Sequence, residues 1–137
     1  MFSKYSVFEN TVSSDLIALK DISNYTGSIL SYSIGMNTPI QSCVTKLERS
    51  TEKVQLWRIR LYNQCFLYCT IDTEFLNSNY EWKKLSELKN FDRIICLDMN
   101  NNTIAEIKEE MQDYAYTLIT QEGNSFLNNI LVRTIEN

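Results

Sequence analysis

The chain has 137 residues, of which 44% are hydrophobic and 22% are charged. These values fit a single globular domain with one hydrophobic core, and they exclude a disordered or fibrous chain. The formal net charge is −4, and Lys and Arg do not cluster along the sequence, which argues against a nucleic-acid-binding surface.

The sequence carries no pattern of a membrane or secreted protein. No apolar run approaches the roughly 20 residues that a membrane-spanning helix needs, and the first residues do not read as a signal peptide. We therefore expect a cytoplasmic protein that acts as a monomer, without a membrane partner.

The cysteines do not form a metal-binding pattern. They lack the paired short spacing of a zinc site, and the chain has no histidine to complete one. We expect neither a metal nor a cofactor, and we expect buried, reduced thiols at Cys43, Cys65, Cys69 and Cys96.

The first third of the chain predicts short strands. Residues 1–5 carry no pattern of their own, and residues 6–12 fit an edge strand. Residues 15–22 fit a strand or a short helix equally well. We then expect a turn at 24–27, a strand at 28–34, and a turn at 35–39 that holds the only proline.

The middle of the chain is richer in β-forming residues. Polar turns at 48–53 and 63–64 separate three predicted strands, which we expect to pair in order as an antiparallel meander. The strands are 40–47, 54–61 and 65–70. Further on, 82–89 predicts a short helix and 93–97 predicts a buried strand.

Residues 103–113 are ambiguous by local pattern. Thr103 could cap a helix with Glu106 at the capping-box position, and Ile104, Ile107 and Met111 would share one face. Long-range pairing can override such local preferences, so a strand remains open. After it, 114–120 alternates like a strand, 121–124 predicts a turn, and 125–132 closes the fold.

Several short motifs occur in an order that resembles the Hint (hedgehog/intein) family. In that family a strand ends in Thr-x-x-His and is followed by Phe-Leu, a Trp, a Leu-x-x-Gly-Asp-x-Ile turn and a closing Asn-Gly-Ile-Leu-Val with a terminal His-Asn. The matching positions here are Thr70, Phe75-Leu76, Trp82, Leu88 to Ile94, Asn128 to Val132 and Asn137.

The chain departs from this pattern at four positions. Thr73 and Glu136 stand where the family has histidines, and Phe91 and Asn129 stand where it has glycines. The resemblance spans nearly the whole chain and leaves no room for an inserted endonuclease, so it implies a minimal domain.

The resemblance implies an all-β fold. We expect a Hint-type horseshoe of long antiparallel strands with pseudo-twofold character and one or two short helical turns, in which 103–113 is a strand. The domain would comprise residues 6–137, and residues 1–5 would be a short flanking segment of the host protein.

The implied function is autocatalytic protein splicing, a single-turnover reaction. Ser6 would attack the carbonyl carbon of Tyr5, a nucleophile following Asn137 would take the acyl group, and Asn137 would cyclise to release the downstream segment. The partners would be the flanking host segments (exteins), or a complementary fragment if the domain is naturally split. A competing register places Asn10 at the nucleophile position and would leave no nucleophile.

The missing histidines are the chemical difficulty, because a serine hydroxyl needs a base at neutral pH. We expect Thr70 and nearby backbone N–H groups to polarise the Tyr5 carbonyl, with Asp72 or Glu136 as acid or base and Thr73 at the histidine position. The alternative is a catalytically degenerate Hint scaffold, or another β-rich protein-interaction domain with partly exposed tyrosines. Splicing requires Ser6 and Asn137 to be neighbours, with Thr70 beside Tyr5.

Overall fold

A computed structural model describes residues 1–21, 25–98 and 102–135 of the chain. Glu136 and Asn137 therefore lie outside the described residues, as does part of the turn expected at 24–27. Within the described residues, no helix is long and apolar enough to cross a bilayer.

The regular secondary structure of the described chain is β, apart from two short 3-10 turns. Its strands form a seven-stranded sheet in the order β10-β6-β7-β1-β11-β5-β4, a four-stranded sheet in the order β12-β13-β8-β9, and the pair β2-β3. The strands are β1 (Phe2–Ser3), β2 (Val7–Glu9), β3 (Leu16–Ala18), β4 (Ser28–Ser33), β5 (Thr38–Arg49), β6 (Val54–Leu61), β7 (Phe66–Cys69), β8 (Glu74–Leu76), β9 (Trp82–Lys84), β10 (Ile104–Asp113), β11 (Ala115–Thr120), β12 (Asn124–Leu127) and β13 (Ile130–Arg133). Two 3-10 turns, η1 (Leu19–Asp21) and η2 (Leu85–Glu87), accompany them.

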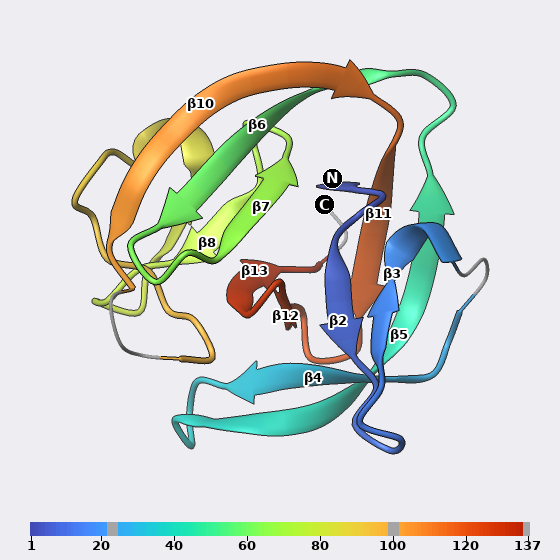
Figure 1. Cartoon of the computed structure of the whole chain (residues 1–137). Coiled ribbons are helices and arrows are strands. Elements are labelled where there is room, and N and C mark those ends of the chain that lie inside the picture. The colour runs from blue at the N-terminus through green and yellow to red at the C-terminus, as the bar shows by residue number, and fades with distance from the viewer. Residues whose placement is uncertain (22–24, 99–101, 136–137) are drawn as a thin grey trace.

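The large sheet is curled, and two consecutive strand pairs produce the curl. β5 runs into β6 and β10 runs into β11, while β6 pairs with β10 and β5 pairs with β11, all antiparallel. In Figure 1, β6 and β10 arch over the upper part and β5 and β11 descend on the right. The expected all-β horseshoe with two similar halves and two short helical turns is confirmed, and so is the strand at 103–113.

The expected three-strand meander is wrong. β6 and β7 form a hairpin, but β5 pairs with β4 and β11 instead of β6. Ser50, just after β5, forms two hydrogen bonds with Ala115. The Ser50 N–H donates to the Ala115 carbonyl at 2.7 Å, and the Ser50 hydroxyl oxygen accepts from the Ala115 N–H at 3.1 Å. The polar segment 50–53 is therefore a bend between two halves of the sheet, a role that its composition cannot distinguish from a hairpin turn.

Four further segments differ from the sequence expectations. Residues 82–89 begin as β9 before η2, and 93–97 forms only isolated bridges, one of them between Cys96 and Ile130. Pro39 lies within β5 opposite Tyr32, where β5 has only β4 beside it, so the missing proton donor breaks no ladder bond. The segment 124–133 is a hairpin, whose turn is made by Asn128 and Asn129 with φ of 50° and 68°.

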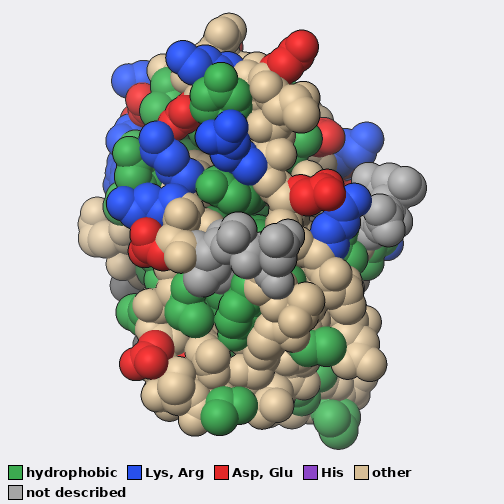
Figure 2. Space-filling model, turned by 90° about the vertical axis from the view of Figure 1, so that its right-hand side faces the viewer, with side chains coloured by type: hydrophobic (Ala, Val, Ile, Leu, Met, Phe, Trp, Pro, Cys, Tyr) green, Lys and Arg blue, Asp and Glu red, His purple; other side chains and the backbone are tan. Residues whose placement is uncertain are grey.

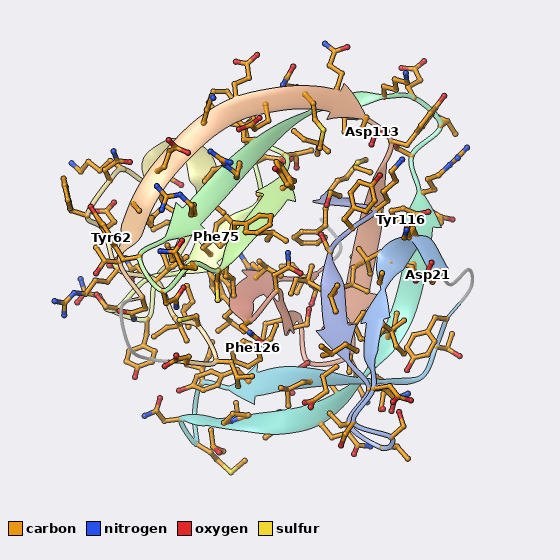
Figure 3. All side chains as sticks on the ribbon, viewed as in Figure 1. Asp21, Tyr62, Phe75, Asp113, Tyr116 and Phe126 are labelled. Carbon is orange, nitrogen blue, oxygen red and sulfur yellow. The ribbon has the colours of Figure 1, made fainter. Side chains whose placement is uncertain are left out.

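The hydrophobic core fills the inside of the curl. Phe75 from β8 is fully buried there, and Phe126 packs edge-to-face on Tyr32 with ring centroids 6.0 Å apart. Figure 3 shows Phe75 and Phe126 pointing into this interior, whereas Tyr62 and Asp113 lie at its rim. Cys69 and Cys96 are buried as expected, whereas Cys43 and Cys65 are only half-buried, and all four thiols are free.

The first residues belong to this core. β1 lies in the middle of the large sheet, between β7 and β11, and Phe2 is only 4% exposed. The N-terminus accordingly lies inside the curl in Figure 1. The folded unit thus includes Phe2 and Ser3, which the sequence assigned to a flanking segment.

Candidate functional site

Met1 is held at two points by Thr70. Its amino nitrogen donates to Thr70 Oγ1 at 2.9 Å, and its carbonyl oxygen accepts from the Thr70 N–H at 3.0 Å. The carbonyl is also within reach of the Thr73 hydroxyl (3.3 Å). These contacts fix the position and direction of the first backbone unit at the end of β7.

The turn that holds Met1 is itself tightly held. The Thr73 N–H donates to the Thr70 carbonyl at 3.1 Å, which closes the turn. The residues of η2 then bind its outer side, since Leu85 N–H donates to Thr73 at 2.8 Å and Ser86 N–H donates to Ile71 at 3.2 Å. The Thr-x-x-Thr motif is therefore part of the rigid scaffold.

Asp72 orients the Thr70 hydroxyl. Thr70 Oγ1 donates to Asp72 Oδ1 at 2.6 Å, which leaves the lone pairs of Thr70 Oγ1 for the Met1 nitrogen. This hydrogen bond lowers the pKa of the Asp72 carboxyl, and the nearby amino group contributes in the same direction. Asp72 is therefore ionised at neutral pH and serves as an acceptor.

Burial shifts the pKa of two other ionisable groups at this site, the Met1 amine and the Cys69 thiol. Although 40% of Met1 is exposed, desolvation of its amino group lowers the pKa from 8.0, against an opposing attraction from Asp72. Burial raises the pKa of the Cys69 thiol to about 12, so this thiol stays protonated and is a poor nucleophile.

The last described residues return to the same place. Thr134 follows β13 and is fastened to the end of β11, with Thr120 and Thr134 hydroxyl oxygens 2.7 Å apart. Ile135 then lines a cavity of about 90 Å³ together with Met1, Asp72 and Thr73. The two ends of the described chain therefore meet beside the Thr70–Thr73 turn.

An ion pair borders this cavity. Arg133 Nη1 donates to Glu74 Oε2 at 2.9 Å, and its guanidinium lies 5.7 Å from the centre of the Trp82 ring. Both charged residues also line the cavity. Sequence reasoning passed over Glu74 and Arg133, because a charged residue at a strand end usually marks a solvated position.

The predicted pair Tyr5 and Ser6 lies elsewhere. Lys4 and Tyr5 form a tight turn between β1 and β2, closed by the Ser6 N–H on the Ser3 carbonyl at 3.1 Å. Ser6 is fully buried, with its hydroxyl oxygen 3.3 Å from that of Ser3. The residue that Thr70 binds is Met1, where the sequence led us to expect Tyr5.

Tyr5 instead belongs to a charged surface. Its side chain is 52% exposed, and the Lys4 and Lys20 ammonium groups lie 5.2 and 5.3 Å from its ring centre. Figure 2 shows Lys and Arg side chains gathered in the upper half of one face, interspersed with Asp and Glu.

Comparison with solved structures identifies the fold. An Ssp DnaB mini-intein variant superposes with a TM-score of 0.91 at 18% identity, covering 99% of this chain and 94% of that one. The gp41-1 intein gives a TM-score of 0.79 at 15% identity, covering 96% of each chain. The chain has the intein fold.

The intein fold is shared more widely among the solved structures. A DnaB intein from Synechocystis sp. PCC 6803 superposes with a TM-score of 0.90 at 18% identity and 98% coverage of both chains. A bacterial intein-like domain from Clostridium thermocellum gives 0.78 at 16% identity and 96% coverage of both. Comparison with protein-family models and with curated proteins gives no match.

Proposed function

We propose that the chain is a self-processing domain that acts in protein splicing, on host-protein segments joined to its two ends. One observation carries the proposal: Met1 and Ile135 line the same cavity beside the Thr70–Thr73 turn. Splicing needs both junctions at one place, and such proximity can contribute about 7–11 kcal/mol to lowering a barrier. The intein fold of the chain supports the same conclusion.

The upstream junction is proposed to be the peptide bond that precedes Met1. In a precursor the Met1 nitrogen is the amide nitrogen of that bond, and Thr70 Oγ1 lies 2.9 Å from this atom in the described chain. The hydrogen bond from Thr70 to Asp72 holds the hydroxyl in place. Thr70 is therefore the residue best placed to interact with the leaving nitrogen.

Met1 has no hydroxyl or thiol, so the attacking group must come from another residue. We assign it to a Ser, Thr or Cys that follows Asn137. Its oxygen or sulfur bonds to the carbonyl carbon before Met1, the carbon–nitrogen bond breaks, and Met1 leaves as an amine with the nucleophile's proton. The Asn137 side-chain nitrogen then attacks its own carbonyl carbon, which releases the downstream segment, and an acyl shift completes the new peptide bond.

The serine-initiated route at Tyr5–Ser6 is the second form of this proposal. It requires the turn at Lys4–Tyr5 to open and the buried Ser6 hydroxyl to reach the Tyr5 carbonyl. It would also separate β1 from the rest of the sheet. In this form Thr70, Asp72, Thr73 and Glu136 keep the supporting roles that the sequence suggests.

A precursor with reporter proteins at both ends and Ser after Asn137 distinguishes the two routes. The Met1 route gives a ligated product without residues 1–5, whereas the Ser6 route leaves Met-Phe-Ser-Lys-Tyr at the junction, and intact mass separates them. Ser6→Ala should leave the first product unchanged and abolish the second. Asn137→Ala should stop release of the downstream reporter by either route. If only precursor accumulates over days, both routes fail.

The second candidate function is a degenerate Hint-fold scaffold without catalysis. The observation in its favour is the site itself, where Met1 supplies no nucleophile and the sequence has no histidine. A precursor that melts cooperatively and yet stays intact would support this function.

A further inference from the structure

We propose that the chain with a free Met1 amine captures acyl groups: a thioester transfers its acyl group to the Met1 nitrogen, with release of the thiol. The inference rests on the proposed function in one respect, because the first acyl transfer of that function would leave Met1 with a free amine. The reaction itself is a separate activity and needs neither Asn137 nor a downstream nucleophile.

The geometry around the Met1 nitrogen is that of an activated nucleophile. An amine attacks with its lone pair, so its N–H groups must be directed to an acceptor. Thr70 Oγ1 is that acceptor at 2.9 Å, and its own proton is directed to Asp72 Oδ1 at 2.6 Å. A base oriented by a third group is the arrangement that activates nucleophiles in enzymes.

The Met1 backbone is also fixed in direction. Its carbonyl is bound by the Thr70 N–H at 3.0 Å and lies 3.3 Å from the Thr73 hydroxyl, and Phe2 next to it is anchored in the core. A free N-terminus samples many directions, whereas this one samples few. Such fixation favours attack by lowering the entropy that the reaction must lose.

Space for the acyl group adjoins the amine. The cavity of about 90 Å³ has Met1 in its wall, together with Asp72, Thr73 and Arg133. The volume suits a small acyl group such as acetylglycyl. Burial, which lowers the pKa of the Met1 amine, further raises its neutral, nucleophilic fraction at neutral pH.

The step balances without a further reactant. The Met1 nitrogen bonds to the thioester carbonyl carbon, and the carbon–sulfur bond breaks. One amine proton passes to Thr70 Oγ1 as the hydroxyl proton moves to Asp72. Because Asp72 is exposed, that proton reaches the departing thiolate through solvent.

The test uses the full chain and the 2-mercaptoethanesulfonate thioester of N-acetylglycine at neutral pH. The reference is the free peptide Met-Phe-Ser-Lys-Tyr, which has the same terminus without the fold. We expect Met1 of the folded chain to be acylated at least about tenfold faster than the peptide's amine. This factor is smaller than the roughly 10²–10⁴-fold that a positioned general base typically contributes. Tryptic digestion assigns the site, because acylation of Lys4 blocks cleavage after it and acylation of Met1 does not.

Three controls keep the result specific. Thr70→Val and Asp72→Asn should bring the rate close to that of the peptide, and Thr70→Ser should restore it. The chain unfolded in urea should also react like the peptide. The amine's pH profile should have its inflection below that of the peptide, because burial lowers the pKa of the Met1 amine.

Acylation of Met1 no faster than that of the peptide, or acylation confined to lysines, would overturn the proposal. Either result leaves the proposed splicing untouched, because the reporter precursor tests that reaction separately. Conversely, a chain that captures the acyl group while the precursor stays intact would retain this activity and lose the splicing proposal.

Discussion

Met1 and Thr70 bind each other through backbone and side chain together, with the Met1 nitrogen 2.9 Å from Thr70 Oγ1 and the Met1 carbonyl 3.0 Å from the Thr70 nitrogen. The backbone bond continues the pairing of β1 with β7, where Phe2 lies opposite Cys69. The hydrogen bond to the Thr70 side chain, in contrast, is not part of the pairing between the strands. It is the contact that a change at position 70 can remove while the sheet stays intact.

Replacing Thr70 with Val should slow upstream cleavage in the reporter precursor by about 10²-fold, which is the usual cost of losing one aligned polar group in an active site. The free energy of unfolding should fall by only about 1 kcal/mol, because the backbone bonds remain. Cleavage is followed by gel densitometry and unfolding by urea titration. Thr51→Val, at an exposed position, is the matched control and should change neither. Equal cleavage rates for Thr70→Val and the parent would remove Thr70 from the mechanism.

Stability should rise with pH up to about pH 8, the ordinary pKa of the Met1 amine. Burial lowers the pKa of the Met1 amine from 8.0, so between its folded and unfolded pKa values the unfolded chain binds more protons. The free energy of unfolding therefore increases with pH through that window and levels off near pH 8. No histidine titrates there. Melting from about pH 6 to about pH 8.5 checks this, because N-acetylation of Met1 should flatten the profile.

Asp72 affects the stability of the fold at acidic pH. Its hydrogen bond with Thr70 lowers its pKa from 3.8, so its stabilising contribution is present above that pH and is lost as the pH falls below it. Asp72→Asn should therefore reduce the acid dependence of melting. It should also enlarge the rise of stability with pH that Met1 produces, because the attraction of Asp72 opposes the lowering of the Met1 pKa.

The fold could be predicted from the sequence to a large extent, since several long strands showed their β composition plainly. β6 was predicted with its observed bounds. The segment 103–113 was decided by resemblance alone, because its local pattern fits a helix. β10 instead forms a long ladder with β6, and that non-local pairing outweighs the helix propensity of its Glu, Lys and Met residues.

The site could be predicted only in part. Thr70, Asp72 and Thr73 were named from a motif, and the structure brings them together around one backbone unit. Met1, the residue that they hold, was missed as a site residue. It precedes β1, which has only two residues, and so short a strand has no periodicity to detect. Ser6 attracted attention by its chemistry, although its burial depends on contacts that only the folded chain reveals.

Phe91 should be replaceable with a gain in stability. Its φ of 75° is costly for a bulky side chain, by about 1–2 kcal/mol. Its ring is 73% exposed, and it stacks on Tyr62 with centroids 6.4 Å apart, which offsets about 0.5–1 kcal/mol of that strain. Phe91→Gly should therefore raise the free energy of unfolding slightly. Phe91→Ala, which loses the stacking and keeps the strain, should be about 1 kcal/mol less stable than Phe91→Gly. The reverse order in urea titrations would contradict the strain.

Gly123 should be essential for placing the tail that carries Ile135. Its φ is +84°, and a Cβ built there would lie 2.7 Å from Ile135 Cγ2, so a side chain strains the backbone and displaces Ile135. Gly123→Ala should cost about 1–2 kcal/mol of stability from the backbone alone. It should also slow processing of the reporter precursor, because Ile135 lines the cavity beside Met1.

The two effects of Gly123→Ala can be separated. Adding Ile135→Ala removes the clash but keeps the backbone strain, so a double-mutant cycle measured by urea titration isolates the contact energy. Gly35→Ala is the matched control, since a Cβ there meets nothing within 4 Å, and it should leave both processing and stability nearly unchanged. Normal processing by Gly123→Ala, with the expected loss of stability, would show that the position of Ile135 does not limit the reaction.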